Sequence, residues 1–291
     1  LYQLSIDRAQ LFDLVNNLGT AASSPTRNDV DSYSSRLHGL LLSPFGAELR
    51  EANQLLLAPT GPLWKVPFCA LIDESGTTLN RYLTINLITS TQLLTALEPT
   101  REGRRRWPTA PLLVAGSQSL AGVKAEVETL SKLLPNSVVL PALEVTRKSF
   151  LEAARGKDLL HLASHSRVQR GEFFLELGSE SLSLEEVYAL QLQPGSLVIL
   201  SSCESAVGEN SQNRELTSFA SAFGLAGAST VIASRWRVED GVTASFFALF
   251  YEALLKGESR GQALRSAQLG IAEEYPHPYY WAAFSLLGDA R

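Results

Sequence analysis

The sequence contains no methionine, and only two of its 291 residues are cysteines. The two cysteines, Cys69 and Cys203, cannot build a disulfide framework, and this scarcity is typical of proteins from a reducing compartment. We therefore expect a cytoplasmic protein. Because methionine is missing even at position 1, we also expect the chain to be a piece of a longer protein.

Long apolar runs and basic surface are scarce as well. No apolar run approaches the ~18 residues needed to cross a bilayer, and no charged and then apolar leader begins the chain. The net charge is −5, and the one basic cluster is the short stretch REGRRRW at residues 101–107. We interpret this cluster as a solvated loop. These features argue against a membrane protein and against nucleic acid as a direct partner.

The residues that are abundant favour a large buried core. Hydrophobic residues make up 45% of the chain and charged residues 19%, which is typical of a soluble globular protein of this length. We predict a single domain over residues 1–291 with three parts. These are N-terminal helices in 1–50, short strands in 51–100 and an α/β core in 110–291.

The α/β core is predicted from strands that alternate with helices. The predicted strands are 111–117, 137–142, 157–166, 196–203 and 229–236, and the predicted helices are 123–134, 146–155, 183–190, 215–227 and 240–257. This order predicts a mostly parallel central sheet with helices on both faces. Upstream of the core, helical spacing occurs in 1–18 and 30–49, and short strands are expected in 53–71 and 81–91.

Two of the predicted strands end in residues that can carry chemistry. KDLLHLASHS delivers His165, and SLVILSSC delivers Cys203. Side chains at the carboxyl ends of parallel strands meet in one cleft. A thiolate is a nucleophile, and an imidazole can exchange protons near neutral pH. Each residue alone is more typical of a packed core, but their matching positions favour a reactive pair.

Several ordered motifs resemble the CHAT branch of the caspase-like cysteine peptidases, which include the separases. LLHLASHS is similar to the family's Leu-His-x-Ala-x-His-Gly strand, LVILSSCES to its strand into Ser-Ala-Cys-Glu, and ASTVIASRWRVED to its Ser-x-Trp-x-Val-x-Asp. LLLAPTGPLWKVPFCAL and the C-terminal stretches LFYEALLKGESRGQALRSAQLGI and PYYWAAFSLLGD also match. The resemblance covers nearly the whole chain and implies a caspase-like fold.

The resemblance implies that Cys203 is the nucleophile and His165 the general acid and base. The backbone N–H groups of Cys203 and Ser166 would form the oxyanion hole. Ser166 and Ala206 stand where the family tends to carry glycine, and serine costs energy in a turn that needs a positive φ. Two functions therefore stay open. One is a cysteine endopeptidase acting on a protein substrate, controlled by a regulatory partner or an N-terminal sensor region. The other is an inactive caspase-like scaffold that binds a partner protein.

The stretch VIASRWRVED is expected, from the same resemblance, to line the pocket for the substrate residue before the cut. Trp236 would form a wall beside Ser234, and the carboxylate of Asp240 would favour Arg or Lys. This preference would make 101–106 and Arg214 candidate self-cleavage sites. Two alternatives stay open. Asp240 is also suited to N-cap the next helix, and Arg235 and Arg237 could attract an acidic residue or narrow the pocket to an aliphatic one.

Other candidate sites are expected to be structural. His161 and His165 have the i, i+4 spacing of a helical zinc site, but they lie on a predicted strand without the glutamate of that motif. We expect neither a metal nor a cofactor. Cys69 is expected to be a packed thiol. Residues 114–122 lack a phosphate-loop motif, which disfavours nucleotide binding. The polar segment 204–215 is expected to be a loop that orders on substrate or partner binding.

Overall fold

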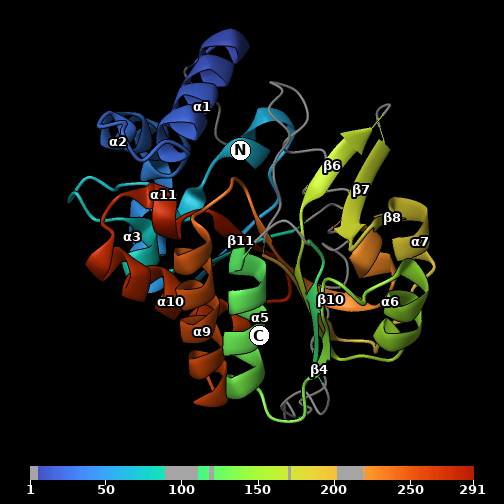
Figure 1. Cartoon of the computed structure of the whole chain (residues 1–291). Helices are drawn as coiled ribbons and strands as arrows, with labels where there is room; N and C mark the ends of the chain where they lie inside the picture. The colour runs from blue at the N-terminus through green and yellow to red at the C-terminus, as the bar shows by residue number, and fades with distance from the viewer. Residues whose placement is uncertain (1–5, 89–110, 118–120, 170–171, 202–218, 220) are drawn as a thin grey trace.

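Eight strands form the central sheet of the molecule (Figure 1). The computed structural model describes residues 6–88, 111–117, 121–169, 172–201, 219 and 221–291. In spatial order the strands are β1 (Gln54–Leu57), β2 (Thr84–Leu87), β11 (Phe284–Gly288), β10 (Ala228–Ser234), β9 (Ser196–Leu200), β5 (Leu159–Ala163), β3 (Leu112–Ala115) and β4 (Val138–Leu140). Six of the seven neighbouring pairs are parallel, and β10 pairs with β11 antiparallel. The predicted mostly parallel sheet is confirmed.

Helices pack against both faces of this sheet, as predicted. The described α-helices are α1 (Arg8–Ala22), α2 (Val30–Leu41), α3 (Gly46–Glu51), α5 (Ala121–Leu133), α6 (Arg147–Ala154), α7 (Leu184–Tyr188), α9 (Asp240–Leu255), α10 (Arg260–Glu274) and α11 (Pro278–Trp281). Residues 219 and 221–225 are also helical. α5, α9 and α10 cover one face, where Val127 and Phe247 belong to the same buried cluster as Ile199. On the other face, Phe150 of α6 belongs to the same cluster as Val198.

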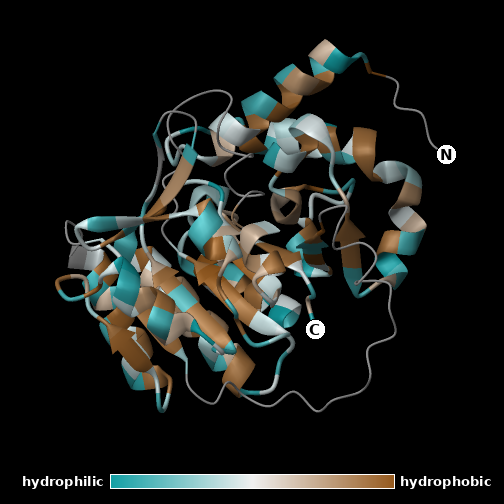
Figure 2. Ribbon diagram, turned by 90° about the vertical axis from the view of Figure 1, so that its right-hand side faces the viewer, coloured by the Kyte–Doolittle hydropathy of each residue, from teal (hydrophilic) through white to brown (hydrophobic). Residues whose placement is uncertain are grey.

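The central strands are buried on both faces, which explains their continuous apolar sequences. Every residue of β5 and of β9 is buried. In Figure 2 the inner strands are coloured mainly hydrophobic, whereas the helices around them carry hydrophilic residues as well. Among the described helices, none is long and apolar enough to cross a membrane.

The N-terminal part differs from its prediction in two places. The helix predicted over 30–49 is broken into α2, the short 3-10 helix η1 (Ser43–Phe45) and α3. Pro44 explains the break, because proline lacks an N–H and its ring clashes with the preceding turn. Of the short strands predicted in 53–71, the structure forms β1 alone in that stretch. It is followed by two 3-10 helices, η2 (Gly61–Lys65) and η3 (Phe68–Ala70), and a further one, η4 (Leu79–Arg81), precedes β2.

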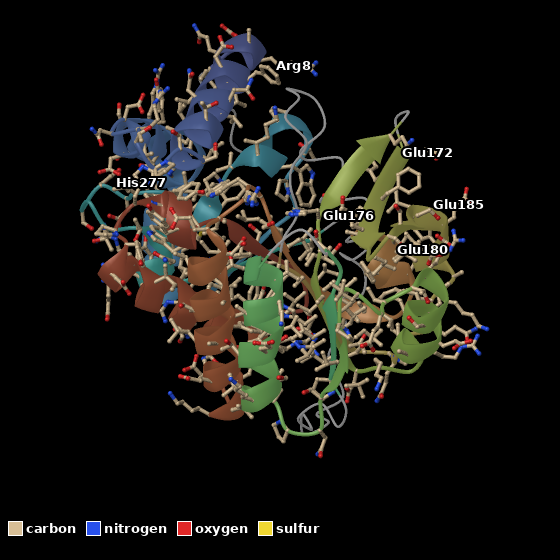
Figure 3. All side chains as sticks on the ribbon, viewed as in Figure 1. Arg8, Glu172, Glu176, Glu180, Glu185 and His277 are labelled. Atoms are coloured by element: carbon tan, nitrogen blue, oxygen red, sulfur yellow. The ribbon has the colours of Figure 1, made fainter. Side chains whose placement is uncertain are left out.

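A second, smaller sheet, which was not predicted from the sequence, follows β5. It contains β6 (Ser166–Gln169), β7 (Glu172–Leu177) and β8 (Glu180–Ser183), all antiparallel. Glu172, Glu176 and Glu180 on this sheet, with Glu185 on α7, carry negative charge on this side of the molecule (Figure 3). The small sheet begins directly after His165, so it borders the candidate site.

Candidate active site

The described part of the sheet ends three adjacent parallel strands, β5, β9 and β10, side by side, and His165 and Trp236 lie just beyond the ends of β5 and β10. Leu162 of β5 pairs with Leu200 of β9, and Leu200 pairs with Ala233 of β10. His165, Cys203 and Trp236 each follow one of these paired residues by three positions. Neighbouring strands lie about 4.8 Å apart. The register therefore aligns the carboxyl ends of β5, β9 and β10.

Backbone and side-chain hydrogen bonds fix His165 against the small sheet. Its carbonyl accepts the Glu176 N–H at 2.8 Å, and the hydroxyl of the preceding residue, Ser164, donates to the Glu176 carbonyl. Ser164 is buried, and His165 is only 9% exposed. Because β7 holds His165 and Ser164 from the same residue, the small sheet sets the position of the histidine.

Gly116, at the end of β3, lies beneath this loop and allows the close approach. Its N–H donates to the Ala163 carbonyl at 2.8 Å, and its carbonyl accepts the Gly178 N–H at 2.7 Å. A Cβ atom at position 116 would lie 2.5 Å from Ser164 Cβ and 2.6 Å from the Glu176 carbonyl oxygen. Only glycine fits here, since a larger residue would displace the atoms that position His165.

The Nδ1 atom of His165 is buried and has no hydrogen-bond partner among the described residues. A buried polar atom without a partner costs about 1–3 kcal/mol, and such atoms are rare in folded proteins. A catalytic role is one of the explanations for such an atom in a native structure. Among the described residues at the carboxyl ends of these strands, His165 is therefore the best candidate for a catalytic group.

The β6–β7 register directs the N–H group of Ser166 away from β7. Ser166 lies opposite Leu175, and the hydrogen bond from Glu176 N–H to the His165 carbonyl marks this as the non-hydrogen-bonded type of antiparallel pair. Among the described non-glycine residues, Asn136 alone has a positive φ. The strain considered for serine at position 166 is therefore absent.

The nucleophile predicted from the sequence, Cys203, lies outside the described residues, as do Ala206 and the segment 204–215. The chain can be followed to Ser201, which is buried and whose N–H donates to the Leu162 carbonyl at 3.0 Å. This hydrogen bond continues the β5–β9 pairing beyond the end of β9, toward position 203.

Ser234, Arg235 and Trp236, which were predicted to line the substrate pocket at the end of β10, each contact different neighbours. Ser234 is buried in the last position of β10, opposite Phe284. The Trp236 indole is 7% exposed, and its Nε1 donates to the Tyr279 carbonyl at 2.9 Å. The Arg235 guanidinium is buried, with Nε donating to Ser285 Oγ at 2.7 Å. Their predicted roles in substrate binding stay predictions.

Asp240 lies at the start of α9, one position inside the helix. The N-cap is Glu239, whose side chain makes no capping hydrogen bond, so the alternative role of Asp240 as N-cap is wrong by one residue. A carboxylate in the first turn still interacts favourably with the helix dipole. Asp240 also packs tightly on α5, because a Cβ at Gly122 would lie 2.0 Å from its Cβ. Arg237 is exposed.

His161, which was expected to be structural and not a zinc ligand, belongs to a fully buried polar network. Its Nε2 lies 2.9 Å from Glu126 Oε1 on α5, and its Nδ1 lies 3.0 Å from the Tyr251 hydroxyl on α9. Burial raises the pKa of Tyr251 well above its ordinary value, so the hydroxyl stays protonated. Glu126 interrupts an otherwise apolar stripe of α5, and that position was the available signal for this network.

Cys69 has the environment expected of a packed thiol. It is 6% exposed in η3, and burial raises its pKa to about 12. Within the described part of the chain, no group of three or more His, Cys, Asp or Glu side chains could hold a metal ion.

Comparisons with known proteins agree with this geometry. The sequence profile of the CHAT domain matches residues 31–289, whereas a search of curated proteins found no match. Separase, in a Saccharomyces cerevisiae separase–securin complex, is similar over 77% of this chain and 14% of its own, with 16% identity and a TM-score of 0.54. The chain thus spans a small part of separase.

Two gingipain structures are similar over a larger share of their length. The Arg-specific cysteine proteinase gingipain R covers 97% of this chain and 74% of its own, with 13% identity and a TM-score of 0.57. A complex of the pro- and mature domains of RgpB from Porphyromonas gingivalis covers 98% and 77%, with 12% identity and a TM-score of 0.56. At these identities the similarity shows a shared caspase-like fold.

Proposed function

The chain belongs to the CHAT domain family, and we propose that it is a cysteine endopeptidase that cleaves a protein substrate with Cys203 and His165. The observation that carries this proposal is the buried, unpartnered Nδ1 of His165 at the edge of the sheet, in the part of the chain that is described. The strand register supports the pairing, because positions 165 and 203 lie equally far beyond the paired residues Leu162 and Leu200.

In the proposed reaction, the Cys203 thiolate attacks the carbonyl carbon of the scissile bond. A tetrahedral oxyanion forms, and its collapse breaks the C–N bond while His165 gives its proton to the leaving amine. The resulting thioester is hydrolysed by water, whose proton passes to His165. When the thioester C–S bond breaks, Cys203 leaves as the thiolate, so Cys203 and His165 have both returned to their starting protonation states. No step of this reaction uses a metal or cofactor.

The oxyanion is expected to accept hydrogen bonds from the backbone N–H groups of Cys203 and Ser166. The orientation of the Ser166 N–H away from β7 supports this assignment. The hydrogen bonds that Glu176 makes with His165 and Ser164 would keep the Ser166 N–H group in place before the reaction begins. Oxyanion stabilisation is strongest when its donors are positioned in advance.

The substrate preference and the control of activity extend this proposal. The partly buried Asp240 is expected to select Arg or Lys before the cut, and the described similarity to an Arg-specific proteinase is consistent with that choice. A protein partner or a further segment is expected to control cleavage, and the similar separase structure contains the partner securin. Replacement of Asp240 by alanine should abolish the basic preference if the assignment is right.

Cleavage of a peptide library, read by mass spectrometry, tests the proposal. Wild-type protein should cut it, the variants Cys203→Ala and His165→Ala should lose most of the rate, and the matched variant Cys69→Ala should retain it. Addition of a chelator should leave the rate unchanged. Retained cleavage in Cys203→Ala would contradict the proposal. Absence of cleavage in folded protein that also fails to react with a thiol-directed peptide would favour the scaffold function.

A further inference from the structure

His277 has two hydrogen-bond partners whose roles are fixed, because both are backbone groups. Its Nε2 lies 2.8 Å from the Arg27 carbonyl, which can only accept, and its Nδ1 lies 3.1 Å from the Tyr279 N–H, which can only donate. In this arrangement the ring is neutral and Nε2 carries its proton. One side chain thus joins the loop between α1 and α2 to the start of α11, and it lies beside the N-terminal helices (Figure 3).

Proline on both sides restricts the backbone of His277. A residue before proline is kept out of the helical region, and His277 has φ −68° and ψ 132° at the N-cap of α11. Pro278 takes the first helical position, where the N–H that proline lacks would have no partner in the helix. The Pro276 carbonyl accepts the Nε1–H of Trp281, which is 3% exposed. The backbone around His277 is therefore held by contacts other than those of its imidazole.

The carbonyl that His277 contacts belongs to a turn with hydrogen bonds of its own. The Arg27 N–H donates to the Ser24 carbonyl at 3.1 Å, and the Arg27 guanidinium pairs with Asp29, with Nε 2.7 Å from Oδ1. Both charged side chains are partly exposed, so this pair adds little to the overall stability. It does restrict the turn, and the N-terminal helices therefore present an ordered acceptor to His277.

Tyr279 connects this contact to the predicted substrate pocket. Its N–H donates to His277, and its carbonyl accepts the indole Nε1–H of Trp236 at 2.9 Å. α11 has only four residues, and a helix of about one turn has little stability of its own. The Tyr279 N–H is one of the groups that a helix start leaves without an intrahelical partner. The position of the Tyr279 carbonyl, and with it the indole of Trp236, therefore depends on the cap that His277 supplies.

We propose that His277 is a positioning residue for Trp236, and that it holds the indole through Tyr279 in the place predicted for the wall of the substrate pocket. Because Arg27 belongs to the loop between α1 and α2, the same contact would transmit a displacement of the N-terminal helices to the pocket. The expected effect on cleavage rests on the proposed peptidase function, whereas the positioning of Trp236 does not.

Hydrogen exchange of the Trp236 indole N–H, measured by NMR on the whole chain with labelled tryptophan, tests the inference without activity. Trp236→Phe assigns the resonance. In His277→Ala the exchange should be about fivefold faster, as expected for a lost helix cap, and in His277→Asn it should stay near the wild-type rate, because asparagine can still cap the Tyr279 N–H. Glu273→Ala, at an exposed position of α10, is the control and should change nothing. An unchanged rate in His277→Ala would overturn the inference, as would an equal increase in His277→Asn.

The protonation of the His277 ring gives a result that needs no variant at this position. In wild-type protein with labelled histidine at pH 8, Nε2 should carry the proton and Nδ1 should be bare. A proton on Nδ1 would contradict the inference even if His277→Ala fails to fold.

Peptide cleavage measures the consequence for the pocket. In His277→Ala the KM should rise several-fold while kcat stays unchanged, because Trp236 is expected to contact a substrate side chain and not the scissile bond. Unchanged KM and unchanged indole exchange in a variant that cleaves would contradict the inference alone. Faster indole exchange in His277→Ala, with no cleavage by the folded wild type, would confirm the positioning of Trp236 and contradict the proposed peptidase function.

Discussion

His161 and Glu126 are joined by a buried hydrogen bond of 2.9 Å between Nε2 and Oε1. The other ring nitrogen, Nδ1, lies 3.0 Å from the hydroxyl of Tyr251, so both nitrogens of His161 have a hydrogen-bonding partner. All three side chains are at most 2% exposed. Through these contacts, His161 links β5 to α5 and to α9. His161 lies four residues before His165 in the sequence.

Replacement of Glu126 by leucine is expected to destabilise the fold by about 3 kcal/mol, because Nε2 of His161 would stay buried without a hydrogen-bonding partner. Replacement by glutamine should cost less, since its side-chain amide can still form a hydrogen bond with Nε2. Urea unfolding followed by circular dichroism measures both effects. Glu128→Gln, on the exposed side of the same helix, is the control and should change the free energy of unfolding by less than about 0.5 kcal/mol.

Replacement of Gly116 by alanine is expected to reduce peptide cleavage strongly and to destabilise the fold by about 1–3 kcal/mol. The added Cβ would meet Ser164 and the Glu176 carbonyl, which hold His165. Gly39→Ala is the matched control, because nothing lies within 4 Å of its added Cβ and the residue is exposed on α2. That variant should be slightly more stable and fully active. A Gly116→Ala variant with unchanged cleavage activity and unchanged stability would contradict this prediction, because it would show that displacement of the Ser164 loop does not affect His165.

The stability of the protein should depend on the charge of His38. Burial lowers the pKa of His38, against the opposing effect of Asp73 and Glu74, so the folded protein binds fewer protons than the unfolded chain. The free energy of unfolding should then decrease as the pH falls below about 6.5, by at most about 1.4 kcal/mol per pH unit from this group. In the variant His38→Gln, the contribution of residue 38 to the change of unfolding free energy with pH should disappear. If the unfolding free energies of wild type and variant change equally between pH 7 and pH 5, the prediction is wrong.

The thiol of Cys69 should be inert in the folded protein. Burial raises its pKa to about 12, and the thiolate is the reactive species. Iodoacetamide at pH 8 should leave Cys69 unmodified until the chain is unfolded in urea. Peptide mapping by mass spectrometry separates Cys69 from Cys203, and rapid labelling of Cys69 under native conditions would contradict the buried position.

The order of strands and helices in the core was predictable because buried parallel strands require continuous apolar sequences, as in β5 and β9. The position of His165 at a strand end was predictable for the same reason. The small sheet was not predicted, although Gly178 separates two stretches of strand-like residues there. The Arg235 and His161 environments could not be predicted, since their partners Ser285 and Glu126 lie far away in the sequence and on other elements.

The most direct test of the proposed Cys203–His165 pair is the attachment site of a peptide with a thiol-reactive electrophile at the position of the scissile bond. We expect one adduct per chain, located on Cys203, formed much more slowly in His165→Ala, and absent from Cys203→Ala. Tandem mass spectrometry of the digested adduct identifies the modified residue. An adduct on Cys69, or none in protein that is folded by circular dichroism, would contradict the proposed Cys203–His165 pair.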